Sequence, residues 1–134
     1  MRVHKYSLPV GLMLAACGAN AAAGDIFIIC NSSVSLKPDE IKDVFFGDKE
    51  FAGSVKLAPA DNGAAQADFL EKVMKVDAKK YTGIWIKKAF RSGSTTPSMK
   101  SSDAEAIAFV KQTPGACGYV ASAPGAGVVV VAKY

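Results

Sequence analysis

Apolar residues fall along the chain in short dense runs, and between these runs they recur at helical spacing. Residues 25–30 form a continuous β-rich run, which is typical of a strand buried on both faces. Further short strands are predicted at residues 55–58, 118–120 and 128–132. The pattern therefore predicts a sheet whose strands are separated by helices.

Four helices are predicted from the apolar spacing and from capping residues. They cover residues 38–47, residues 64–74, residues 78–90 after the N-cap Asp77, and a segment that starts with the capping box of Ser102 and Glu105. Segments rich in polar residues, Gly and Pro predict loops at residues 59–63 and 91–97. Strands that alternate with helices indicate an α/β fold with three layers, in which helices flank a mostly parallel sheet.

The first 21 residues are predicted to be a secretory signal peptide, which leaves residues 22–134 as a single domain. Basic residues precede an apolar run at residues 8–16 that is too short to span a bilayer, and small residues at 19–21 fit a cleavage site. The predicted location is the periplasm. As an alternative, residues 14–17 fit a lipobox, in which Cys17 would be lipidated and would anchor the protein.

Composition narrows the classes of function. The net charge is +4, and it becomes +2 once Arg2 and Lys5 leave with the signal, so an anionic partner is mildly favoured. His4, the only histidine, also lies in the signal, and no nucleophile or phosphate-loop motif is present, so we do not expect an enzyme. We expect no cofactor and no metal site. Nucleic acid is not an expected partner, because an exported chain without a stacking array of aromatics is poorly suited to it.

Two cysteines, Cys30 and Cys117, remain after cleavage at Ala21. Each lies at the edge of a predicted strand, and an oxidising periplasm permits a disulfide between them. The alternative is that both are small buried apolar residues.

Two segments are candidate sites for a small anion such as phosphate. The first is the connection Asp61, Asn62, Gly63 and Ala64, which runs from a strand into a helix whose free backbone N–H groups suit an anion. Such loops lie beyond the carboxyl ends of parallel strands, where ligands collect. The alternative is a plain connection in which Asp61 or Asn62 caps the helix.

The second candidate is the loop that carries Arg91, Ser92, Ser94 and Thr95, which offers a guanidinium fork and several hydroxyls. It lies in a window with no acidic residue between Lys79 and Lys100. This basic surface suits an anionic solute, a lipid surface or an acidic protein partner. The alternative is a solvated helix followed by a mobile surface loop.

Two motifs near opposite ends of the mature chain carry a family resemblance. The helix end Asp43–Gly47 reads DVFFG, and the turn and strand at Pro114–Val120 read PGACGYV. Together they resemble signatures of the periplasmic phosphate-binding proteins, the receptors of phosphate ABC transporters. The mature chain is similar to one lobe of these two-lobed, type II periplasmic binding proteins and to their small single-lobe exported relatives.

The resemblance implies an exported solute-binding protein with a phosphate loop at residues 59–65. Pro59 stands where the receptors carry an arginine, and Gly63 and Ala65 stand where they carry hydroxyl side chains. Asp61 matches the acidic residue of the family. The alternative function is a periplasmic interaction or sensory accessory domain that binds a membrane transporter or sensor protein, and a homodimer would let two lobes face each other.

Overall fold

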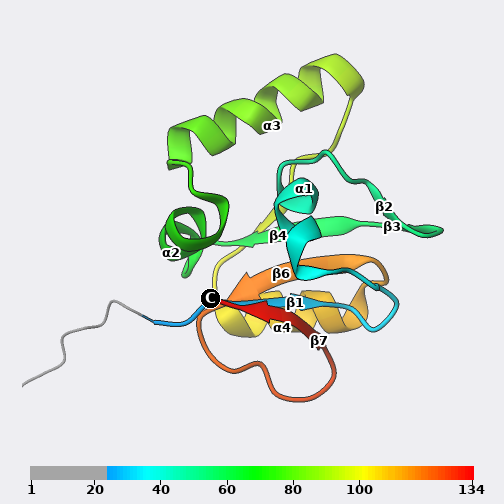
Figure 1. The fold of residues 1–134 in the computed structure, drawn as a ribbon, viewed down its shortest axis with the longest axis vertical. Coiled ribbons are helices and arrows are strands. Elements are labelled where there is room, and N and C mark those ends of the chain that lie inside the picture. Colours follow the sequence, from blue (N-terminus) through cyan, green and yellow to red (C-terminus); the bar gives the residue numbers. More distant parts are fainter. Residues whose placement is uncertain (1–23) are drawn as a thin grey trace, which may run out of the picture.

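The computed structural model describes residues 24–134 and contains a sheet of five strands in the order β5-β4-β6-β1-β7 (Figure 1). The strands are β1 (Phe27–Cys30), β4 (Ala58–Asn62), β5 (Ser98–Lys100), β6 (Ala116–Val120) and β7 (Val129–Lys133). β4 is parallel to β5 and β6, whereas β1 is antiparallel to both of its neighbours. The predicted α/β class is therefore confirmed, but the sheet is mixed, because β1 runs opposite to the other four strands and makes two of the four strand pairings antiparallel.

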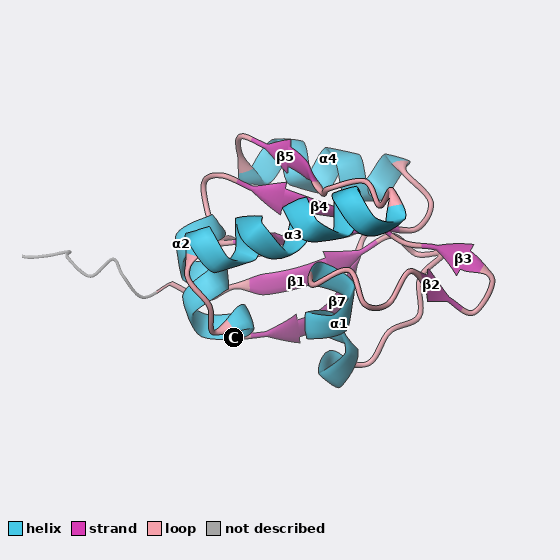
Figure 2. Ribbon diagram, turned by 90° about the horizontal axis from the view of Figure 1, so that it is seen from above, coloured by secondary structure: helices cyan, strands magenta, loops and turns pink. Residues whose placement is uncertain are grey.

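Helices cover both faces of the sheet (Figures 1 and 2). One face carries the 3₁₀ turn η2 (Pro38–Glu40), α1 (Ile41–Phe45), α2 (Gln66–Phe69), the π-helical turn η3 (Leu70–Met74) and α3 (Ala78–Ser92). The other face carries α4 (Asp103–Gln112), and a small hairpin of β2 (Phe51–Ala52) and β3 (Val55–Lys56) lies beside the sheet. No helix within residues 24–134 combines the length and the apolar character needed to cross a bilayer.

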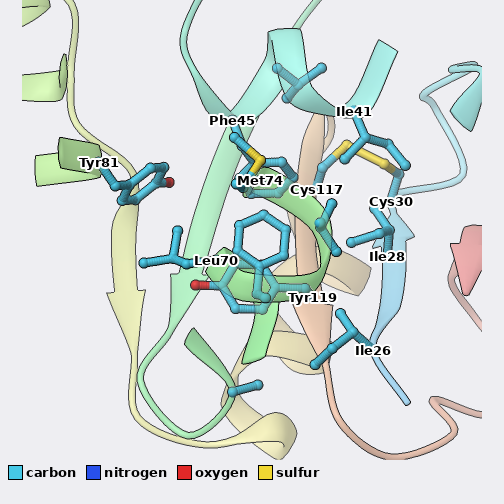
Figure 3. Packing of buried hydrophobic residues seen from close by; sticks show 14 of the residues in the cluster. Ile26, Ile28, Cys30, Ile41, Phe45, Leu70, Met74, Tyr81, Cys117 and Tyr119 are labelled. Carbon is cyan, nitrogen blue, oxygen red and sulfur yellow. A yellow bond between two sulfur atoms is a disulfide. The ribbon is translucent and has the colours of Figure 1, made fainter. Parts of the chain in front are cut away.

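The core has two parts because β1 and β6 bury side chains on both faces. On the first face, the rings of Phe69 and Tyr119 stack with centroids 3.7 Å apart, and Phe45 meets both rings edge-on (Figure 3). On the second face, Ile29 and Val120 contact α4. β1 begins at Phe27 and is buried on both faces, as the β-rich run at residues 25–30 predicts.

Cys30 and Cys117 lie directly opposite each other in the antiparallel pair of β1 and β6, with their Cα atoms 4.0 Å apart. They form a disulfide that is fully buried beside Ile28 and Ile41 (Figure 3). The bond therefore joins a strand near the start of the domain to one near its end. The predicted signal peptide and Cys17 lie outside the described residues.

The loop predicted at residues 59–63 was wrong, because most of it belongs to β4. Pro59 argued against a strand, because proline cannot donate a backbone hydrogen bond to a neighbouring strand. Ala58 donates its N–H toward the β6 side, to Gly115, so the nitrogen of Pro59 faces the side of β5. Pairing with β5 begins only at Ala60, so no hydrogen bond is lost at this position.

The loop predicted at residues 91–97 begins later than expected, because α3 continues through Ser92 and ends at Gly93 in the left-handed conformation. The short strand β5 follows and was not predicted. Asp77 caps α3 as predicted, accepting a hydrogen bond from the N–H of Lys80 at 2.8 Å. At α4, Ser102 accepts from the N–H of Glu105 as expected, but the Glu105 carboxylate accepts from Ser101 instead of closing the box on Ser102.

Candidate functional site

Asp61 lies in β4 and its carboxylate is buried against two tyrosines. The Tyr119 hydroxyl donates to Oδ1 at 2.8 Å and the Tyr81 hydroxyl donates to the same atom at 3.0 Å. Burial raises the pKa of Asp61 above its ordinary value, and the two hydroxyl donors only partly offset this. Burial, followed by the neighbouring carboxylate, also raises the pKa of both tyrosines, so they stay protonated donors.

Asn62, the next residue of β4, is completely buried, and its polar atoms are all used inside the protein. Its amide donates to Asp103 at 2.8 Å and to the carbonyl of Tyr119 at 3.0 Å, and its oxygen accepts from the N–H of Ala64 at 3.0 Å. Asp103 in turn accepts from Ser122 and Ala121. Asn62 therefore ties the end of β4 to β6 and to the start of α4, and Asp103 links this junction to the segment after β6.

The backbone donors expected to receive an anion at the first candidate segment already have partners. The N–H of Gly63 donates to the carbonyl of Lys100 at 2.7 Å, and that of Ala65 donates to the carbonyl of Asn62 at 3.0 Å. Ala64 donates to the side chain of Asn62, as described above. α2 itself has only four residues, so its dipole is short. This segment is therefore a plain connection between strand and helix, but neither Asp61 nor Asn62 caps the helix, because the N-cap of α2 is Ala65 and no side chain caps it.

The second candidate segment, in contrast, borders a cavity of about 200 Å³. Its lining brings three hydroxyl residues of the loop together with charged residues from a distant part of the chain: Ser92, Ser94, Thr95, Lys49, Glu50 and Lys56. Trp85, Leu57 and Pro59 supply apolar parts of the wall. Arg91 is exposed on the last turn of α3 and does not line this cavity.

The charges around this cavity are partly free to meet a ligand. Lys49 forms an ion pair with Glu40 at 3.3 Å, which occupies one of the three donors of its ammonium group. Within residues 24–134, Lys56 forms no ion pair. Glu50 adds one carboxylate to the lining. The cavity thus offers ammonium and hydroxyl donors together with a single carboxylate acceptor.

A second cavity of about 200 Å³ lies between α3 and β5. Asp61, Tyr81 and Trp85 are its buried lining, and Ile86, Pro97 and Met99 stand nearer the surface. Trp85 is shared by both cavities, and its indole N–H donates to the carbonyl of Phe45 at 2.9 Å. The structure therefore separates the predicted site residues: Asp61 faces this second cavity, and the loop hydroxyls face the first.

No model of a known protein family matches the chain, and no curated protein matches it either. The function is therefore inferred from the geometry of the cavities and from the residues that line them.

Proposed function

We propose that the protein is an exported binding module of the solute-binding type, similar to one lobe of a phosphate receptor, that holds a small anion such as phosphate. The anion is held in the cavity bordered by the loop at residues 92–95. The observation that carries the proposal is that Lys49 and Lys56 line one cavity together with Ser94 and Thr95. The resemblance supports the same ligand class but places it at residues 59–65, whose backbone donors are occupied.

The donor set suits phosphate better than sulfate. Two ammonium groups and the hydroxyls satisfy anionic oxygens. At neutral pH phosphate keeps at least one proton and sulfate keeps none, so the Glu50 carboxylate can accept a hydrogen bond from phosphate but would repel sulfate. We therefore expect selectivity for the protonated anion.

Export to the periplasm is supported by the buried disulfide between Cys30 and Cys117, because such bonds persist in oxidising compartments. It is also supported by the predicted signal peptide at residues 1–21. We propose that the mature protein, residues 22–134, acts in the periplasm.

Calorimetric titration of the mature protein with phosphate, with sulfate as the control ligand, tests the function. Lys56→Ala removes a charge-assisted contact worth about 1.5–3 kcal/mol, so affinity for phosphate should fall about tenfold to a hundredfold. Lys87→Ala is the matched control, because Lys87 is another exposed cation, on α3, and does not line the cavity. Asp61→Asn should leave phosphate affinity unchanged.

Two results would contradict the proposal. One is the absence of any heat with phosphate while the protein is folded. The other is phosphate binding that Asp61→Asn abolishes and Lys56→Ala spares, which would return the site to β4 and its junction with α2.

A further inference from the structure

Asp61 is the only buried acidic residue among residues 24–134, and it has no cation of the protein beside it. It is 5% exposed, and none of the ion pairs within the described part of the chain involves it. The hydroxyls of Tyr81 and Tyr119, which point toward one another in Figure 3, both donate to it. Neutral donors stabilise a carboxylate but leave its charge uncompensated, and a buried charge is costly unless it is paired. The site therefore lacks a positive charge.

One oxygen of this carboxylate retains capacity to accept hydrogen bonds. The two short bonds, of 2.8 and 3.0 Å, both end on Oδ1. Oδ2 lies 3.3 Å from the Tyr81 hydroxyl, which has a single proton and already donates to Oδ1. Burial raises the pKa of Asp61, and the two hydroxyls and the amide of Gln66 offset this only in part. A stronger donor that reaches Oδ2 would therefore stabilise the ionised carboxylate.

The cavity between α3 and β5 gives access to this carboxylate, and Asp61 is the only charged residue that lines it. Tyr81 and Trp85 supply aromatic rings, whose faces attract cations. Ile86 and Met99, which are 59% and 56% exposed, supply apolar wall near the surface. The volume of about 200 Å³ is below the roughly 300–1,000 Å³ of sites for drug-sized molecules. The lining thus suits a small ligand with a cationic head and a short apolar tail.

We propose that the cavity between α3 and β5 binds a small primary amine in its protonated form. The ammonium group donates to Oδ2 of Asp61, and the tail of the amine contacts Ile86 and Met99. An ammonium group has three N–H donors, and the hydroxyls of Thr82 and Thr96, which also line the cavity, can accept from the remaining two. This site is separate from the proposed anion site, with which it shares only Trp85.

Other cations fit the lining less well. Ca²⁺ takes six to eight oxygen ligands, whereas this wall has one carboxylate and is otherwise largely apolar, and residues 24–134 contain no cluster of three acidic, His or Cys ligands. A quaternary ammonium ion has the charge but no N–H to donate to Oδ2. Exposed cations on α3 repel any of these ligands, but none of them lines the cavity and salt screens their charge: Lys79, Lys80, Lys87 and Arg91.

Titration of the mature protein with butylammonium chloride, at about 0.15 M salt and without phosphate, tests the proposal. Trp85 lines the cavity and is the only tryptophan of the chain, so its fluorescence reports on the occupant. We expect a saturable change with a dissociation constant on the order of 1 mM, as suits a ligand of so few atoms. 1-Butanol, which has the same tail without the charge, should bind at least about tenfold more weakly, and tetramethylammonium should also bind more weakly.

Two kinds of variant locate the site. Asp61→Asn keeps the shape of the side chain and removes its charge, so butylammonium should bind about tenfold more weakly or worse. Met99→Lys places a cation at an exposed position of the lining and should weaken binding about tenfold, whereas the control Phe90→Lys adds the same charge outside the cavity and should have little effect. Lys56→Ala should leave butylammonium binding unchanged, which separates this test from that of anion binding.

The proposal is overturned if the folded protein shows no saturable response to butylammonium, or if 1-butanol or tetramethylammonium binds as tightly. It is also overturned if folded Asp61→Asn binds butylammonium as well as the wild type does. Circular dichroism checks the fold of each variant. If Asp61→Asn does not fold, the comparison of Met99→Lys with Phe90→Lys decides, because both substitutions are at exposed positions, and equal affinities for butylammonium would then overturn the proposal.

Discussion

Removing the disulfide between Cys30 and Cys117 should cost a large part of the stability of this domain. The two residues are 87 positions apart, so the bond closes a loop that spans most of the domain. The chain-entropy relation for a loop of this length gives about 4–5 kcal/mol at 25 °C. The free energy of unfolding of a small domain is about 5–15 kcal/mol, so the disulfide supplies a substantial fraction of the stability.

The perturbation is the double substitution Cys30→Ala and Cys117→Ala. Alanine is chosen over serine because both positions are fully buried, and a buried hydroxyl without a partner would add its own cost. Urea unfolding should give a free energy of unfolding about 4–5 kcal/mol lower for the double variant than for the oxidised wild type. The wild type treated with a reductant should approach the value of the double variant.

Two findings would refute this reasoning. Thiol titration of the unfolded, unreduced mature protein should detect no reactive thiol, and detection of two free thiols would mean that the bond is not formed. A loss of less than about 1 kcal/mol in the double variant would mean that the reduced chain is already restricted, so that the loop-closure argument does not apply.

Three further predictions concern the junction and the turn. The raised pKa of Asp61 means that the folded state binds the proton of this carboxyl more tightly than the unfolded state does. The stability of the wild type relative to Asp61→Asn should therefore be highest below about pH 4 and should fall as the pH rises through the pKa of Asp61 in the folded state. Urea unfolding at several pH values measures this difference, and a difference that does not change with pH would contradict the prediction. Gly115→Ala should lower the free energy of unfolding by on the order of 3 kcal/mol or more, because φ is +84° and the added Cβ would collide with the carbonyl oxygen of Lys56. Gly125→Ala is the control: φ is +77° there but the space around it is open, so thermal unfolding should show a loss of only about 1 kcal/mol. Asn62→Ala should lower the free energy of unfolding by about 2–3 kcal/mol, because it leaves buried polar groups without partners, and a loss below about 0.5 kcal/mol would mean that water replaces the side chain.

The elements with strong periodicity were predictable, and those defined by pairing were not. The run at residues 25–30 and the cap at Asp77 are local signals, and both appear in the structure as expected. The sequence predicts a loop where the structure has β4, because Pro59 and the polar residues Asp61 and Asn62 are typical of a turn. Its strand character comes from its neighbours β5 and β6, whose register no local pattern records.

The candidate site was only partly predictable for the same reason. The hydroxyls of the loop at residues 92–95 could be recognised from composition. Lys49 precedes β2 and Lys56 is the last residue of β3, so both are far from that loop in sequence and no spacing links them to it. Asp61 and Asn62 are predicted as ligand residues because a loop that runs from a strand into a helix is a common site for anions. Here their partners are Tyr119, Tyr81 and Asp103, which reach them only once the sheet has formed.

The attachment of α3 to the sheet determines where the two cavities lie. Its inner side is held by two directional bonds, from Tyr81 to Asp61 and from Trp85 to the carbonyl of Phe45. These bonds fix the helix over the sheet although only Tyr81 and Trp85 of its fifteen residues are buried. The remaining positions carry little of the core, so cations and Phe90 can occupy them with almost no effect on folding. This attachment leaves a cavity on each side of Trp85. Lysines and hydroxyl residues line one cavity, and apolar residues together with the buried Asp61 line the other. A helix attached at two points over a sheet thus leaves two hollows within one domain, and the proposed anion site occupies one of them.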